Sequence, residues 1–265
     1  MNKTIVLFDM DGTLTEPRCS FGSTTLERDL YVLTNTGVHI GIVTGSDLNY
    51  LSEQMQDFLN RSPSRYKTHL LPCNGTKYLE PPKFANQDHN LVYDVSMVDE
   101  LGGEKYRKLV KEIIDLQMEI SDKQIPLSGH FIDYRGSMIN WCPIGRKATK
   151  QQREEFKRID SFHGLRNNAL ADLRSQLEWL EIEDSVVVKL GGDTSFDIYP
   201  TGWDKTYALK HFKGWDVWFV GDRCCIDGND YEIFNACGDQ SFVTYGPKKT
   251  SGIIQQIIHK LKERQ

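Results

Sequence analysis

Short apolar runs alternate with helical periodicity at both ends of the chain. Ile5–Phe8 and Val38–Val43 are continuous apolar runs, the pattern of strands buried on both faces of a parallel sheet. Between them leucines recur at helical spacing, and Gly37 stands where such a helix would end. This order predicts a β-α-β unit. Similar patterns predict a helix with Ser46 as its N-cap, strands at His69–Leu71, Val217–Val220 and Ser241–Thr244, and an amphipathic helix over Ile253–Leu261.

The middle of the chain has a different pattern, in which strand pairs and helices are mixed. Runs at His130–Tyr134 and Met138–Trp141 predict a hairpin, Leu165–Leu180 a helix, and Val186–Leu190 and Phe196–Tyr199 further strands. We therefore predict an α/β protein: a Rossmann-like parallel sheet core with an inserted α+β cap domain. The expected core comprises residues 1–85 and 200–265, and the cap residues 86–199, with boundaries near proline-rich segments.

Composition narrows the functional classes. With 39% apolar and 26% charged residues the chain is expected to fold, and 32 Lys and Arg against 37 Asp and Glu give a net charge of −5. That balance offers no overall attraction to nucleic acid or a membrane surface, and no run approaches the ~18 apolar residues of a membrane span. The six cysteines form no C-x-x-C pair. We expect free thiols, a cytoplasmic location, and no nucleic-acid or membrane partner.

Two carboxylates follow the first predicted strand directly. Asp9 and Asp11 stand in the sequence Asp-Met-Asp-Gly-Thr, at the edge of the sheet where open α/β folds bind ligands. Alternate residues of an extended chain point the same way, so both carboxylates can face one site. They would serve as ligands for Mg²⁺ or as a nucleophile with an acid/base partner. The alternative is an ordinary Asp-Gly turn.

Other polar residues follow later strands. Thr44 and Ser46 open a helix, where hydroxyl and N–H groups can hold phosphate, although simple capping explains them too. Asp222 and the loop from Asp227 to Asp230 offer oxygen ligands for Mg²⁺, or form only an acidic turn. Lys205 can neutralise phosphate charge, although an isolated lysine is usually solvated surface.

Together these segments resemble the haloacid dehalogenase superfamily of phosphotransferases. Longer strings make the chain similar to the eukaryotic-type phosphomannomutases over nearly its whole length and in the same order. These strings are Asp11–Arg18, Tyr134–Arg146, Arg153–Phe156, Gly191–Lys205 and Gly228–Phe234.

The resemblance implies a role for each matching residue. Asp9 is then the nucleophile, Asp11 the acid/base and Lys205 a catalytic cation; Mg²⁺ is held by Asp9, the main-chain carbonyl of Asp11 and Asp222, with Asp230 as a further candidate ligand. The implied sugar-phosphate contacts are Arg18, Arg135, Arg146, Arg153, Ser195 and Asp197. The implied substrate is a hexose phosphate, with hexose 1,6-bisphosphate as activator. A homodimer through the cap is also implied, with apolar positions in Leu109–Ile120.

The residues also support a binding role for the arginines. Arg135, Arg146 and Arg153 can converge on a second phosphate as bidentate clamps, and Asp197 can accept hydrogen bonds from sugar hydroxyls. Scattered arginines are, however, normally surface residues. The resemblance, together with these residues, favours phosphomannomutase acting through an aspartyl phosphate as the function. A pure binding protein has little need for both Asp9 and Asp11.

Some positions depart from the family pattern. Thr44 replaces a common family glycine and restores the Thr-Gly of sugar phosphatases, which keeps a Mg²⁺-dependent sugar-phosphate phosphatase as the alternative. The segment Arg223–Ile226 also differs from the family, with its spacing preserved.

Overall fold

The computed structural model describes residues 3–226 and 228–264, which divide into two compact units. Residues 1–94 and 203–265 make up the first unit, and residues 95–202 the second. The α/β class predicted from the sequence is confirmed. The division falls nine residues after the predicted boundary at residue 85 and three after the one at residue 199. The first difference has a clear cause, because residues 90–94 form an edge strand that pairs within the first unit.

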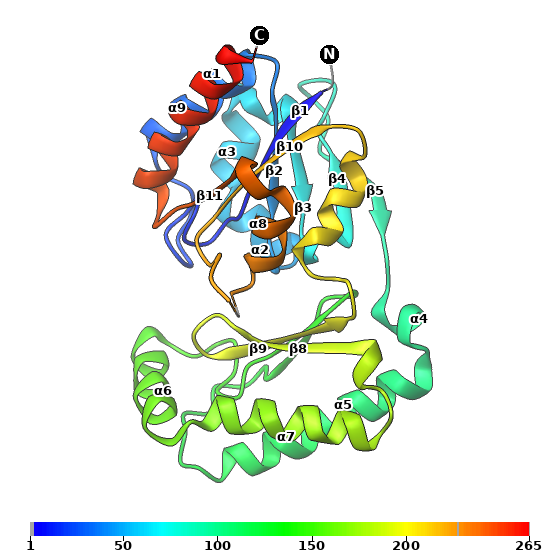
Figure 1. Cartoon of the computed structure of the whole chain (residues 1–265). Helices are drawn as coiled ribbons and strands as arrows, with labels where there is room; N and C mark the ends of the chain where they lie inside the picture. Colours follow the sequence, from blue (N-terminus) through cyan, green and yellow to red (C-terminus); the bar gives the residue numbers. More distant parts are fainter. Residues whose placement is uncertain (1–2, 227, 265) are drawn as a thin grey trace. The chain divides into compact units, whose positions relative to one another are not determined.

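A seven-stranded sheet forms the centre of the first unit (Figure 1). Its order is β11-β10-β1-β2-β3-β4-β5; the first five strands are parallel, whereas β4 and β5 are antiparallel. The strands are β1 (Thr4–Phe8), β2 (His39–Val43), β3 (Thr68–Leu71), β4 (Lys77–Glu80), β5 (Asn90–Asp94), β10 (Asp216–Gly221) and β11 (Ser241–Val243). The helices are α1 (Thr24–Asn35), α2 (Leu48–Gln54), α3 (Gln56–Arg61), α8 (Tyr231–Cys237) and α9 (Pro247–Glu263), with short 3₁₀ segments η1 (Pro63–Lys67), η2 (Cys73–Gly75), η4 (Lys205–Phe212) and η5 (Gly238–Gln240).

Both faces of this sheet are buried, which explains the continuous apolar runs. Val6 and Phe8 point into a core shared with α1, α2, α3 and α9, whereas Ile5 and Leu7 point into a second core shared with η4 and α8. Alternate residues of one strand therefore enter different cores. The helix predicted after Ser46 is interrupted at Met55, where α2 ends and α3 begins.

The second unit contains a four-stranded antiparallel sheet in the order β6-β7-β9-β8, with α5 and α7 along one face (Figure 1). Trp141 on β7 stacks on Phe196 of β9 with ring centroids 4.4 Å apart, and its indole N–H donates to Gln117 of α5. These contacts join sheet and helix. The elements are α4 (Met97–Leu101), α5 (Gly103–Ser121), β6 (Ile132–Tyr134), β7 (Ile139–Trp141), α6 (Lys150–His163), α7 (Leu165–Trp179), η3 (Glu183–Ser185), β8 (Val186–Gly191) and β9 (Ser195–Pro200).

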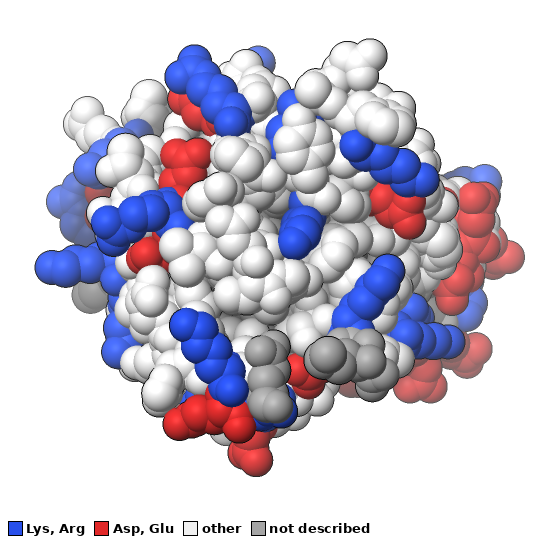
Figure 2. Space-filling model, turned by 90° about the horizontal axis from the view of Figure 1, so that it is seen from above, with Lys and Arg blue, Asp and Glu red and all other residues white. Residues whose placement is uncertain are grey.

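One face of the molecule carries charged side chains of both signs (Figure 2), and the cysteines are thiols. On the face shown in Figure 2, basic and acidic side chains are interspersed around a largely uncharged centre. All six cysteines are free thiols. No helix among the described residues is both long and apolar enough to cross a membrane.

Candidate active site

The candidate active site of the first unit lies where three parallel strands end. β1 leads into Asp9, β2 into Thr44 and β10 into Asp222. The N–H of Asp9 donates to the carbonyl of Val220 on β10 at 2.9 Å, so the pairing of the two strands continues to the first acidic residue. The parallel neighbours β10, β1 and β2 therefore bring these polar residues to one edge of the sheet.

Three carboxylates converge at this edge. Asp9, Asp222 and Asp230 each offer an oxygen, and these oxygens lie within 4.8 Å of one another. Lys205 is buried among them and donates to Oδ1 of Asp9 and, at 2.5 Å, to Oδ1 of Asp230. Asp227, placed by the sequence in the same acidic loop, lies outside the described residues.

Asp230 organises this group. Its Oδ2 accepts hydrogen bonds from the backbone N–H groups of Asp222, at 3.1 Å, and Arg223, at 3.0 Å, while its Oδ1 accepts from Lys205. Both oxygens thus hold protein donors in a fully buried side chain. The carboxylate fixes the backbone after β10 and the position of the lysine ammonium together.

Burial and neighbouring charges shift the protonation of the site. Burial raises the pKa of Asp9; Lys205 opposes that shift and Asp230 adds to it. The pKa of Asp222 is raised by burial and by Asp230. Burial disfavours the charge on Lys205, but Asp230 and Asp9 outweigh burial, and the net effect is a raised pKa. The group therefore has more buried negative charge than one lysine neutralises.

The site also fits a hard divalent cation. Gly12 has a φ of +82°, and a Cβ there would overlap the Asp222 carboxylate, so only glycine lets the loop approach this carboxylate so closely. Among the described residues, the buried side-chain oxygens of Thr13 and Asn229 have no hydrogen-bond partner. Three clustered carboxylates are a donor set that Mg²⁺ prefers.

Asp11 is placed apart from the three-carboxylate group. Its Oδ1 accepts hydrogen bonds from the backbone N–H of Arg18, at 2.9 Å, and from the hydroxyl of Tyr50, at 3.0 Å. The chain turns after Met10, whose carbonyl accepts from Thr13, Leu14 and Thr15. The extended conformation considered from the sequence thus ends before Asp11, and the two aspartates have different partners. For Asp11, the resemblance implies that the main-chain carbonyl, and not the side chain, is a ligand of Mg²⁺.

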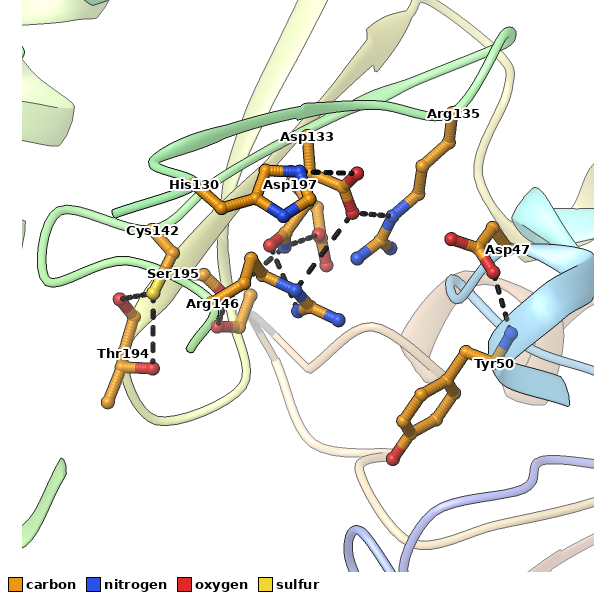
Figure 3. Close-up of polar contacts among 12 residues, drawn as sticks. Asp47, Tyr50, His130, Asp133, Arg135, Cys142, Arg146, Thr194, Ser195 and Asp197 are labelled. Atoms are coloured by element: carbon orange, nitrogen blue, oxygen red, sulfur yellow. Dashed lines mark hydrogen bonds and ion pairs between the residues drawn. The ribbon is translucent and has the colours of Figure 1, made fainter. Parts of the chain in front are cut away.

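The strand-end residues after β2 are also arranged by backbone contacts. Thr44 is buried, and its hydroxyl accepts from the N–H of Ser46 at 3.1 Å. The predicted N-cap at Ser46 was wrong by one residue: Asp47 caps α2 by accepting from the N–H of Tyr50 at 2.7 Å (Figure 3). Ser46 instead belongs to the loop before the helix, because its N–H donates to Thr44 and its carbonyl accepts from the N–H of Cys73.

The second unit carries the other predicted contacts. Asn140 on β7 donates to Asp197 at 2.7 Å and to Ser195 at 3.2 Å, both on β9. The side-chain amide oxygen of Asn140 accepts from Arg146 at 3.1 Å. A Cβ at Gly191 would lie 2.7 Å from the Asp197 carboxyl carbon, so this glycine makes room for the carboxylate. Three residues named from the sequence therefore meet around one asparagine.

A second carboxylate organises two of the predicted arginines. Asp133 accepts from Nε of Arg135 at 3.0 Å and lies 3.9 Å from Nε of Arg146, and His130 approaches it at 3.4 Å (Figure 3). The third predicted arginine, Arg153, makes further contacts within the second unit. Arg153 donates to the carbonyls of Arg146 and Ala148 and to the hydroxyl of Thr194.

Sequence reasoning missed several residues of these groups. Asp133 was missed, although its spacing from Arg135 was a usable signal. The two residues lie two positions apart, which puts side chains on one face of a strand. Asn140 stood inside a quoted family string but received no role. Tyr50 gave no signal, because only the folded chain brings α2 to the loop after β1.

Comparison with known proteins agrees with this geometry. The model of the eukaryotic phosphomannomutase family matches residues 27–260. Phosphomannomutase 1 of Dictyostelium discoideum is 34% identical, with 97% of both chains covered. The phosphomannomutase of Schizosaccharomyces pombe is 38% identical, covering 88% of this chain and 85% of its own.

Solved structures of low sequence identity share the fold. A Plasmodium falciparum IMP-nucleotidase has a TM-score of 0.66 at 15% identity, covering 97% of this chain and 71% of its own. Trehalose-6-phosphate phosphatase of Aspergillus fumigatus has a TM-score of 0.52 at 18% identity, covering 98% and 93%.

Proposed function

The chain belongs to the eukaryotic phosphomannomutase family of enzymes, and on that premise we propose that it interconverts mannose 6-phosphate and mannose 1-phosphate through an aspartyl phosphate and a hexose 1,6-bisphosphate. One observation carries the proposal. Asp9 is a buried carboxylate held by a buried lysine at the edge of the sheet, beside two further carboxylates. This arrangement suits a nucleophile toward phosphate rather than a structural ion pair alone.

In the proposed reaction an Asp9 oxygen attacks phosphorus in line. The bond from that oxygen to phosphorus forms while the bond from phosphorus to the sugar oxygen breaks, and Asp11 gives its proton to the departing oxygen. In the reverse transfer a sugar hydroxyl loses its proton to Asp11 and takes the phosphoryl group. Lys205 fixes the Asp9 carboxylate and offsets negative charge.

The acidic group accounts for the proposed cofactor. Asp9, Asp222 and the Asp11 main-chain carbonyl would hold Mg²⁺, which when bound neutralises charge on the phosphoryl oxygens. Asp230 could bind Mg²⁺ only through oxygens that already accept hydrogen bonds from the protein. Its main task is to hold Lys205 and the backbone of Asp222.

The proposal also assigns the residues that recognise the substrate. We propose that Arg135, Arg146 and Arg153 bind the phosphate that is not transferred, since guanidinium groups match phosphate geometry. Ser195 and Asp197, ordered by Asn140, would bind sugar hydroxyls. Arg18, Thr44 and Ser46 would bind the reacting end.

The proposal includes a homodimer through the second unit and a cytoplasmic location. Helix α5 buries Leu109 and Ile113 but exposes Ile114 and Met118, which offers an apolar face to a second copy. Free thiols are typical of reducing compartments.

Radiolabel transfer tests the function. Enzyme labelled from ³²P-glucose 1,6-bisphosphate is quenched, digested and mapped, then in a second sample chased with mannose 1-phosphate. We expect the label on the peptide containing Asp9 and, after the chase, in hexose bisphosphate. Label released as inorganic phosphate, with none in sugar, would support the phosphatase instead.

A further inference from the structure

Tyr50 contacts the carboxylate to which we assign proton transfer. Its hydroxyl donates to Oδ1 of Asp11 at 3.0 Å, and the backbone N–H of Arg18 donates to the same oxygen at 2.9 Å. One carboxylate oxygen therefore receives two protein donors.

The fold fixes Tyr50 from two sides. Its N–H donates to the Asp47 cap in the first turn of α2, and its ring packs against the core that lies under α1 and α9. The phenol projects from the helix in Figure 3. The hydroxyl is thus a placed donor rather than a mobile surface group, because both ends of the residue are held.

We infer that Tyr50 is a positioning residue for Asp11: it fixes which oxygen of that carboxylate faces the substrate. Oδ1 accepts two hydrogen bonds from the protein, which leaves Oδ2 as the oxygen that can meet the sugar oxygen. A general acid needs its proton on the oxygen that faces the leaving group. This inference rests on the role proposed above for Asp11.

The variant Tyr50→Phe keeps the ring and removes the donor. The Arg18 N–H remains, so we expect a partial effect: about a tenfold slower transfer, a fraction of the ~10²–10⁴ that acid–base catalysis supplies. The affinity for sugar phosphate should be unchanged, because the variant keeps the ring and alters none of the residues assigned to the sugar or its phosphates.

Two phosphoryl donors separate positioning from a structural role. With mannose 1,6-bisphosphate the departing alkoxide needs a proton, whereas p-nitrophenolate leaves from p-nitrophenyl phosphate without one. Rapid-quench and stopped-flow measurements of the first turnover report the same step, phosphorylation of the enzyme, for both donors. Tyr50→Phe should slow the first reaction about tenfold and the second less than about twofold.

Two further variants complete the test. Tyr78→Phe loses a buried hydroxyl that bonds His69 at 2.8 Å in the same unit, and should leave both first turnovers unchanged. Asp11→Asn should slow the sugar reaction far more than Tyr50→Phe does. Equal losses on both donors, or no loss, in Tyr50→Phe would overturn the inference. Full sugar turnover by Asp11→Asn would instead refute the proposed role of Asp11, whatever Tyr50→Phe does.

Discussion

The ammonium of Lys205 lies 2.5 Å from Oδ1 of Asp230, and both side chains are almost fully buried. The same ammonium bonds Asp9, so one lysine joins the proposed nucleophile to the carboxylate that fixes the loop after β10. A buried charge of this kind is stable only with its partners in place. The group therefore links stability to catalysis.

Replacing Lys205 by Met should lower both the stability of the fold and the turnover of the enzyme. Asp9 and Asp230 would stay buried without a counter-charge, and we expect a loss of about 3–5 kcal/mol in the free energy of unfolding, together with loss of turnover. Urea unfolding with and without Mg²⁺ measures this, and Mg²⁺ should stabilise the variant more than the parent. Lys213→Met, an exposed lysine just after η4, is the control. Equal stability of the two variants would contradict the assignment.

Gly12→Ala tests the packing of the loop against Asp222. Alanine at a φ of +82° costs about 1–2 kcal/mol, and its Cβ would displace the Asp222 carboxylate. We expect lower stability and a higher Mg²⁺ concentration for half-maximal activity. Gly37→Ala is matched, since Gly37 has a φ of +94° with nothing near its Cβ position. It should lose stability but keep the Mg²⁺ requirement; a changed requirement in both would argue against a metal role for Asp222.

Asp133→Asn should weaken sugar-phosphate binding. The carboxylate orders Arg135 and Arg146, and its neutral replacement removes a charge-assisted contact. We expect a roughly tenfold higher KM for mannose 1-phosphate, equivalent to about 1.4 kcal/mol, and little change for p-nitrophenyl phosphate. Steady-state kinetics with both substrates measures this. A similar loss on both would show that Asp133 serves the fold and not the substrate.

A buried histidine should make stability depend on pH. Burial lowers the pKa of His69 to about 3, from an ordinary 6.5. Below pH 6.5 the unfolded chain therefore binds a proton that the folded chain rejects, and stability falls with pH until about pH 3. From pH 7 to 5 this one residue costs about 2 kcal/mol.

The variant His69→Gln removes that proton while retaining a polar side chain. Urea unfolding at both pH values should show the parent losing about 2 kcal/mol more than the variant. His89, whose pKa is lowered to about 4 by burial, causes a further loss of stability on acidification, in the parent and the variant alike. An identical pH dependence in parent and variant would refute this prediction.

The sequence predicted those parts of the fold that follow from local patterns. β1 and β2 were found because both faces of the sheet bury alternate residues such as Phe8 and Leu7. β5 was missed because its apolar run, Leu91–Tyr93, is only three residues long, and because all five residues of this edge strand are exposed, so no alternation of buried and polar positions marks it.

The same distinction holds for the site. Asp9, Asp222 and Lys205 could be named because strand ends and family strings identify them. The bond from Tyr50 to Asp11 spans 39 residues, and the turn after Met10 that separates Asp11 from Asp9 depends on backbone hydrogen bonds. No spacing rule predicts either contact.

Phosphorus NMR of a mannose 1-phosphate solution tests the central claim most directly. Enzyme, Mg²⁺ and a catalytic amount of hexose 1,6-bisphosphate are added, and the signals of both mannose phosphates and inorganic phosphate are followed together. We predict that mannose 6-phosphate appears to equilibrium, that the bisphosphate is required, that inorganic phosphate stays a slow side product, and that Asp9→Asn shows no conversion. Stoichiometric release of inorganic phosphate without mannose 6-phosphate, or full conversion by Asp9→Asn, would contradict the account.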